Sequence, residues 1–222
     1  MKPRLVLFDL DHTLLTGDSD VLWCDFLMRR GLLEPDEFAA RNAGMESRYR
    51  AGTVGAQEFA GFYVSTLAGH SRASLEPLRQ AFLADVIVPR IPREALELVR
   101  SNLEAKALVV LTTATNRYIT ELTATHLGIE HLIATEAEIS DGRFTGRTAG
   151  TLNMREGKVA RLHDWLRSRG EALGSFESAA YSDSINDRPL LETVDEPVAV
   201  DPDAQLLAIA TERGWRVLRL AR

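Results

Sequence analysis

From residue 91 onward, short apolar runs alternate with amphipathic stretches of helical length along most of this 222-residue chain. Such alternation is typical of a parallel β-sheet that carries helices on both faces. We therefore expect an α/β fold. The strand-length runs in this part of the chain are residues 107–111, 132–135, 179–181, 198–200 and 215–218.

The segment before this alternation has a different pattern. An apolar run at residues 5–8 predicts one strand, and residues 17–88 then show only helical spacing of apolar side chains. Asp20 is the expected N-cap of the first helix in this segment. We expect an all-helical cap domain at residues 17–88, inserted into a core domain built from residues 1–16 and 89–222. The predicted helices of the insert are residues 20–31, 35–49, 57–67 and 74–87.

Composition excludes several classes of protein. The net charge of −6 gives no general attraction to nucleic acid or to an anionic membrane surface. No apolar run approaches the ~18 residues that a membrane-spanning helix needs, and the first residues lack the apolar stretch of a signal peptide. Cys24 is the sole cysteine, so an intrachain disulfide is impossible. We expect a cytoplasmic monomer or homodimer.

Two carboxylates follow the first predicted strand, Asp9 and Asp11. Ligands of open α/β sheets bind at the carboxyl ends of the strands, where both side chains are expected. Two like charges so close imply a bound cation, a shared proton or a division of catalytic roles. The alternative is an Asp-rich turn without chemistry.

Three more polar motifs follow predicted elements at the same edge. Residues 112–116 read Thr-Thr-Ala-Thr-Asn after an apolar strand, which suits an oxyanion but also an ordinary helix cap. Lys158 stands near a helix start, where a cation is mildly disfavoured unless it faces an anion; the alternative is a solvated lysine. Asp183 and Asp187 form a second carboxylate pair, and hard cations such as Mg²⁺ prefer oxygen ligands.

In this order, the four motifs resemble those of the haloacid dehalogenase superfamily. The helical insert directly after the first motif resembles the phosphoserine-phosphatase-like branch, subfamily IB. The resemblance covers nearly the whole chain and implies a Rossmann-like core, Mg²⁺ and an aspartyl-phosphate intermediate. It implies a phosphatase acting on a small phosphorylated metabolite, such as phosphoserine or histidinol phosphate.

The resemblance also implies roles for the motif residues. Asp9 is the expected nucleophile toward phosphorus, and Asp11 the expected general acid and base. Thr113 is expected to hold a phosphoryl oxygen, and Lys158 to neutralise charge between Asp9 and the phosphoryl group. Asn186 matches a position that orients phosphate or substrate.

The same resemblance implies a metal site and two departures from the family pattern. Mg²⁺ is expected on Asp9, the Asp11 carbonyl and Asp183, with Asp187 in or near its shell. Ala114 stands where phosphoserine phosphatases tend to have glycine, so its Cβ reshapes the pocket floor. Members of the family often have a glutamate at the entrance of the cap that binds the ammonium group of the substrate. Asp18 stands at the matching place in this chain, and its alternative role is to cap a helix.

Two other functions use the same residues. A phosphotransferase passes the phosphoryl group from the aspartyl phosphate to an acceptor other than water. A non-catalytic module only binds a phosphorylated ligand, although such a module has no need of a nucleophile and an acid.

Overall fold

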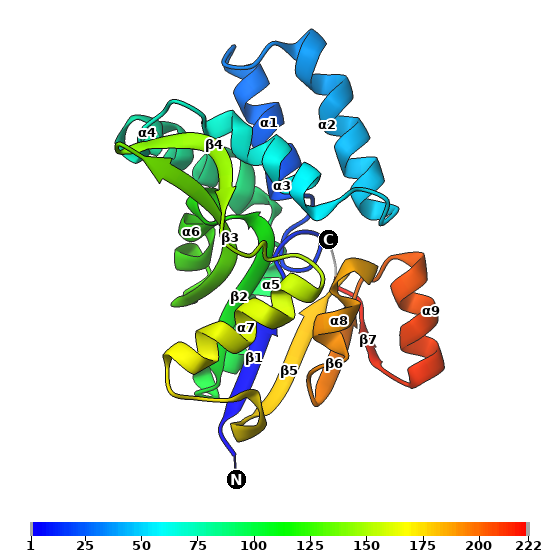
Figure 1. Ribbon diagram of the computed structural model, residues 1–222. Helices are drawn as coiled ribbons and strands as arrows, with labels where there is room; N and C mark the ends of the chain where they lie inside the picture. The colour runs from blue at the N-terminus through cyan, green and yellow to red at the C-terminus, as the bar shows by residue number, and fades with distance from the viewer. Residues whose placement is uncertain (1, 221–222) are drawn as a thin grey trace.

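The computed structural model describes residues 2–220, apart from the side chains of residues 37 and 50. Within these residues the chain forms a seven-stranded sheet with the strand order β4-β3-β2-β1-β5-β6-β7 (Figure 1). The strands are β1 (Arg4–Phe8), β2 (Leu108–Asn116), β3 (His131–Ser140), β4 (Arg143–Ala149), β5 (Glu177–Ser182), β6 (Glu196–Val200) and β7 (Arg216–Leu218). The helices are α1 (Ser19–Arg29), α2 (Pro35–Arg50), α3 (Ala56–Val64), α4 (Arg72–Phe82), α5 (Arg93–Glu104), α6 (Arg117–His126), α7 (Glu156–Ser168), α8 (Arg188–Leu191) and α9 (Ala204–Arg213).

The sheet is parallel from β3 to β7, and β1 lies at its centre between β2 and β5. In the register, Phe8 lies beside Leu111 of β2 and Tyr181 of β5, so these three strands end at the same edge. The α/β fold expected from the alternation of strands and helices is confirmed.

Alternate side chains of the central strand bury opposite faces of the sheet, as the period of two in a strand requires. Val6 and Phe8 pack in a cluster with the apolar faces of α5 and α6. Leu5 and Leu7 pack with α7, α8 and α9 on the other face. Because helices cover both faces of the sheet, the central strand is apolar at every position after Arg4.

The insert between β1 and α5 lies over the carboxyl ends of the central strands (Figure 1). Its first helix begins and ends earlier than expected, at Ser19 and Arg29, and Asp18, not Asp20, is its N-cap. Asp18 has extended backbone angles, and its Oδ1 accepts the N–H groups of Asp20 and Val21. Asp20 lies within the first turn, where its side chain cannot reach those N–H groups.

The third and fourth helices of the insert are shorter than expected. α3 ends at Val64 and a 3₁₀ turn, Ser65–Leu67, follows it. α4 ends at Phe82 and continues as a π turn, Leu83–Ile87, and a 3₁₀ turn, Val88–Arg90. The assignment of residues 17–88 to a separate domain stays a prediction.

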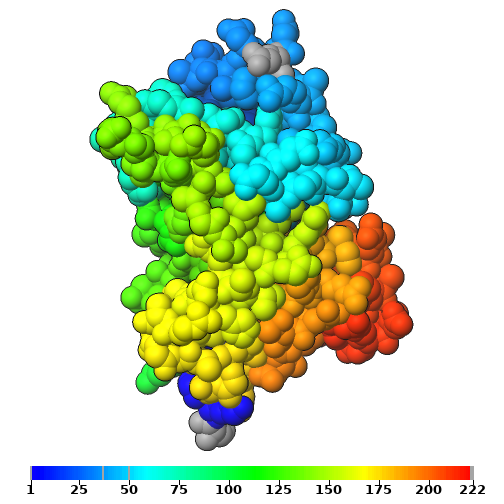
Figure 2. Space-filling view, viewed as in Figure 1, coloured from blue at the N-terminus to red at the C-terminus, as the bar shows by residue number. Residues whose placement is uncertain are grey.

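The β3–β4 hairpin is longer than the sequence indicated and connects the sheet to the insert. Its turn lies at Asp141 and Gly142, both with positive φ, as an Asp-Gly turn between strands requires. The Gly69 N–H donates to the Phe144 carbonyl, and the Phe144 N–H donates to the His70 carbonyl. Figure 2 shows cyan atoms of the insert directly against the yellow-green atoms of this segment.

Candidate active site

Asp9 and Asp11 extend from the end of β1 into a tight turn. The Asp9 N–H donates to the Tyr181 carbonyl, which continues the β1–β5 ladder by one residue. The Leu10 carbonyl then accepts the N–H groups of three residues, and His12 adopts a left-handed conformation with φ 57°. This turn stops the strand and leaves both carboxylates at its end. The residues whose N–H groups bind Leu10 are Thr13, Leu14 and Leu15.

A buried lysine joins the first carboxylate to one from the other end of the chain. Lys158 Nζ lies 2.7 Å from Asp9 Oδ1 and 2.6 Å from Asp187 Oδ2. Ser182 donates a further hydrogen bond to Asp187 Oδ2 at 2.7 Å. Lys158 is only 1% exposed, so the sequence alternative of a solvated lysine does not apply. Burial opposes its charge, but Asp187 and Asp9 outweigh burial and raise the pKa of Lys158.

A third carboxylate shares a single hydroxyl with the first. Thr13 Oγ1 lies 3.0 Å from Asp9 Oδ2 and 3.2 Å from Asp183 Oδ1, and it accepts the Asp183 N–H. One hydroxyl proton serves only one of the two carboxylates at a time. Burial raises the pKa of Asp9 to about 7 and the pKa of Asp183 well above its usual range, and the neighbouring carboxylates act in the same direction.

This donor set fits a divalent cation. Asp9, Asp11, Asp183 and Asp187 bring four carboxylates to one place, and Lys158 brings one compensating charge. A hard cation bound by one or two carboxylates, a carbonyl and waters would offset the excess of negative charge. Within residues 2–220, His, Cys, Asp and Glu side chains do not by themselves form a group of three or more that could hold a metal ion. The expected site combines Asp9 and Asp183 with the backbone carbonyl of Asp11.

Asp11 is oriented by donors from the insert and from β2. The Ser19 N–H donates to its Oδ1 at 2.7 Å. Thr115 Oγ1 lies 3.0 Å and Thr113 Oγ1 3.3 Å from its Oδ2. Because strand β2 runs on to residue 116, beyond the predicted end at 111, these hydroxyls belong to the strand itself.

A cavity of about 170 Å³ opens over this cluster at the carboxyl edge of the sheet. Tyr49 of α2 forms part of its wall, opposite the sheet residues. Burial raises the pKa of the Tyr49 hydroxyl, so the ring stays neutral. Within the described chain, the lining residues include no lysine or arginine. They are Asp9, Asp11, His12, Tyr49, Ala114, Asp183, Ser184, Asp201 and Asp203.

The predicted residues do not all reach the cavity in the same way. Ala114 lines it, as do Asp9, Asp11 and Asp183. Thr113 and Lys158 bind the lining carboxylates Asp11 and Asp9, and Asp187 lies behind them, bound to Lys158. Their chemical roles stay predictions.

The remaining two predicted residues have protein partners. Asp18 is 5% exposed and its Oδ1 caps α1, the alternative role that the sequence left open. Asn186 accepts a hydrogen bond from Arg155 Nε at 3.0 Å and donates one to the Tyr49 carbonyl at 3.0 Å. Substrate contact by Asp18 or Asn186 stays a prediction.

Several site residues were missed from sequence. Thr13 lies within the first motif but was given no role. Asp201 and Asp203 follow strand β6 at the carboxyl edge, so the rule that found Asp183 would also have found them. Asp203 accepts the Ile185 N–H and donates its own N–H to the Asp183 carbonyl, which fixes the loop carrying Asp183. Tyr49 had no sequence signal, because its helix has no strong apolar face.

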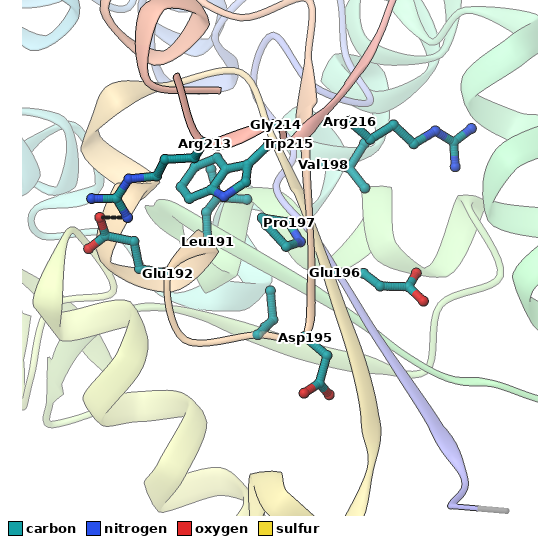
Figure 3. A pocket seen from close by; sticks show the side chains of 11 residues that line it. Leu191, Glu192, Asp195, Glu196, Pro197, Val198, Arg213, Gly214, Trp215 and Arg216 are labelled. Carbon is teal, nitrogen blue, oxygen red and sulfur yellow. Dashed lines mark ion pairs between the residues drawn. The ribbon is translucent and has the colours of Figure 1, made fainter. Parts of the chain in front are cut away.

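A larger cavity lies at the opposite edge of the sheet, where β6 and β7 begin (Figure 3). Its volume is about 530 Å³, and Trp215 lies across it. Two ion pairs involve its lining residues: Arg213 with Glu192, and Glu196 with Arg4. None of the predicted site residues lines it, so size alone does not identify the reactive site.

Comparison with known proteins agrees with the geometry. The pattern of the haloacid dehalogenase-like hydrolase family matches residues 6–192. A histidinol-phosphatase of Neisseria meningitidis is 40% identical over 217 residues, which cover 97% of this chain and 98% of the relative. The phosphoserine phosphatase SerB1 of Mycobacterium tuberculosis is 34% identical over 225 residues, covering 97% of this chain and 71% of the relative.

Solved structures extend the comparison. A protein of unknown function from Bordetella pertussis Tohama I has a TM-score of 0.93 and 47% identity, covering 98% of this chain and 99% of that one. A substrate-bound phosphoserine phosphatase has a TM-score of 0.70 at 16% identity, with 98% and 93% covered, and supports the fold alone. The chain belongs to the haloacid dehalogenase-like hydrolase family and is an enzyme of its phosphatase type, similar to phosphoserine and histidinol phosphatases.

Proposed function

We propose that this enzyme is a Mg²⁺-dependent phosphatase that hydrolyses a small amine-bearing phosphomonoester through a phosphorylated Asp9. The observation that carries the proposal is the position of Asp9. Its two oxygens are held by Lys158 at 2.7 Å and Thr13 at 3.0 Å, and Asp11 follows two residues later in the same cavity. A fixed carboxylate beside a second one suits covalent phosphoryl transfer with acid–base assistance.

The first step is attack of an Asp9 oxygen on phosphorus. The bond from phosphorus to the leaving oxygen breaks, and that oxygen takes a proton from Asp11. The donors Ser19, Thr113 and Thr115 hold Asp11 in one orientation for this transfer. Lys158 stabilises the negative charge that Asp9 and the phosphoryl oxygens share.

The second step returns Asp9 to its free form. Asp11, now a carboxylate, takes a proton from water as the water oxygen attacks phosphorus. The bond between phosphorus and Asp9 breaks, and inorganic phosphate leaves.

Asp9, the Asp11 carbonyl and Asp183 are the groups that would hold Mg²⁺. When bound, the ion would offset charge on the phosphoryl oxygens and on these carboxylates. Asp187 accepts hydrogen bonds from Lys158 and Ser182 through the same Oδ2. We therefore assign Asp187 chiefly to holding the lysine in place.

The charge of the lining supports histidinol phosphate as a substrate before phosphoserine. The cavity lining carries five aspartates, Asp9, Asp11, Asp183, Asp201 and Asp203, and among the described lining residues there is no lysine or arginine. An ammonium group on the substrate is attracted to this acidic lining. A second anionic group, such as the carboxylate of phosphoserine, is repelled by it. The histidinol-phosphatase relative, identical at 40% of positions, points the same way.

Turnover of p-nitrophenyl phosphate, histidinol phosphate and phosphoserine, each with Mg²⁺ and with excess EDTA, tests the proposal. We expect Mg²⁺-dependent release of phosphate and a higher kcat/KM for histidinol phosphate than for phosphoserine. Binding without turnover would favour the non-catalytic module. Phosphorylated products in the presence of added alcohols would favour the phosphotransferase. Cytoplasmic location and the monomer-or-dimer state stay predictions; no helix within residues 2–220 is both long and apolar enough to cross a membrane.

A further inference from the structure

The corner between α2 and α3 is held against the core beside the cavity. Arg155, in the loop before α7, is one of the core residues that contact it. Its Nη2 donates to the Gly52 carbonyl at 3.0 Å and to the Val54 carbonyl at 3.1 Å. Its Nε donates to Asn186 Oδ1 at 3.0 Å, which fixes the guanidinium plane. One side chain therefore joins two carbonyls of the insert to the core.

Asn186 makes the second connection at the same corner. Its Nδ2 donates to the Tyr49 carbonyl at 3.0 Å. The Tyr49 ring lines the cavity above the carboxylates and stacks on Phe59 at 4.4 Å between centroids. Asn186 thus fixes the backbone of the residue whose ring forms the cavity wall.

The backbone of Arg155 carries strain that its side-chain contacts explain. Its φ of 52° and ψ of −127° lie in a region that favours glycine. A non-glycine residue persists there only when its surroundings hold it. Its carbonyl accepts the Lys158 N–H at 3.0 Å, so the same residue sets the start of the helix that carries Lys158.

We propose that Arg155 and Asn186 form a latch that holds the α2–α3 corner closed and thereby places Tyr49 at the wall of the active-site cavity. Both are positioning residues, because their side chains contact carbonyls, each other and, for Asn186, the Ser184 hydroxyl. The kinetic consequence of the latch rests on the proposed function, whereas its structural consequence does not. Other contacts join the insert to β4, such as Gln57 to Thr148 at 3.0 Å, but they lie on the hairpin side.

The latch predicts how substrate binding responds to its loss. If the latch opens, only a fraction of molecules keeps Tyr49 in place, and the apparent affinity falls by that fraction. Hydrogen bonds from a charged donor to carbonyls are strong enough for a KM increase of about tenfold or more. The groups that make and break bonds are untouched, so kcat is expected to stay within about threefold.

Arg155→Gly is the sharpest variant because glycine tolerates the local φ while the guanidinium is removed. Arg48→Ala is the matched control. Arg48 lies in the last turn of α2, the helix that carries Tyr49, and its ion pair with Glu58 at 2.6 Å stays within the insert. Hydrogen–deuterium exchange of residues 51–56 gives a readout that does not need activity. Asn186→Ala is read by exchange alone, because its neighbour Asp187 belongs to the charged cluster.

We expect Arg155→Gly and Asn186→Ala to speed exchange at residues 51–56, with the sheet unchanged. Arg155→Gly also raises KM, while Arg48→Ala changes neither exchange nor KM by as much. The latch is wrong if Arg155→Gly leaves exchange and KM as in the wild type, or if Arg48→Ala matches it in both. A large fall in kcat at constant KM would also overturn it, because it would place Arg155 at the reacting atoms. If the wild type has no phosphatase activity, the proposed function is wrong. Hydrogen–deuterium exchange of residues 51–56 then still tests whether the latch exists.

Discussion

The floor and the wall of the active-site cavity are built in different ways. On the floor, Asp9, Lys158 and Asp187 are buried and bonded side chain to side chain, although they come from distant parts of the chain. On the wall, Tyr49 belongs to a helix whose neighbouring positions are mostly exposed, and the core holds it through backbone carbonyls. Contacts between particular side chains fix the floor. Contacts to carbonyls leave the identity of the wall residues free, so we expect chemistry in the first region and selectivity in the second.

The largest effect expected on the floor is that of Asp9→Asn. The amide cannot attack phosphorus, so turnover should fall by about a thousandfold or more on every substrate. Steady-state kinetics on p-nitrophenyl phosphate and histidinol phosphate measures the loss, and circular dichroism checks the fold. If the variant kept a tenth of wild-type activity, Asp9 would not be the nucleophile.

The second-largest loss of activity is expected on substitution of the proposed metal ligand Asp183. Asp183→Ala removes an oxygen that a hard cation needs, and activity should fall by about a hundredfold or more. The activity that remains should no longer rise with Mg²⁺, and beryllofluoride should add to the wild type only when Mg²⁺ is present. Asp164→Ala, on the exposed side of α7 and paired with Arg167, is the control and should behave as the wild type. A variant that kept the wild-type response to Mg²⁺ would remove Asp183 from the metal site.

The floor was largely predictable from sequence, and the wall was not. Asp9, Thr113 and Asp183 each follow an apolar strand, and parallel strands end at a common edge, so the chain order alone places them together. The insert gave only helical periods, which show where a helix lies but not which residue faces the cavity. Tyr49 was therefore missed, and the cap of α1 was placed at Asp20, two residues late. Arg155 was missed because its contacts to the insert are to backbone carbonyls, which leave no mark in the side-chain pattern.

The charged cluster of the floor should also contribute to stability. Lys158→Met keeps most of the length of the side chain but leaves Asp9 and Asp187 without their buried partner. Removal of one partner of a buried ion pair costs about 3–5 kcal/mol, because the remaining charges lose their compensation. Urea unfolding in EDTA at neutral pH measures this change. Arg167→Met, which removes an exposed partner on the same helix, should change stability by less than about 1 kcal/mol. Equal changes in the two variants would mean that the buried cluster does not support the fold.

The smallest expected effect is at Asp18, in the insert just before α1. Asp18 caps α1, and we propose that it also attracts the substrate ammonium when the insert is closed. Asp18→Asn keeps an oxygen that can cap the helix but removes the charge, so stability should stay near that of the wild type. Its kcat/KM for histidinol phosphate should fall about tenfold more than for p-nitrophenyl phosphate, which has no ammonium group.

Asp18→Ala separates the two roles of this residue. It removes both cap and charge, so it should show the same change of selectivity together with a loss of about 1 kcal/mol of stability. If Asp18→Asn instead affects both substrates equally, or neither, Asp18 acts only as the cap of α1. The substrate ammonium would then have to bind at the acidic lining of the cavity, which includes Asp183, Asp201 and Asp203. Selectivity would in that case come from the sheet edge, and the division of roles between floor and wall would be wrong for this part of the substrate.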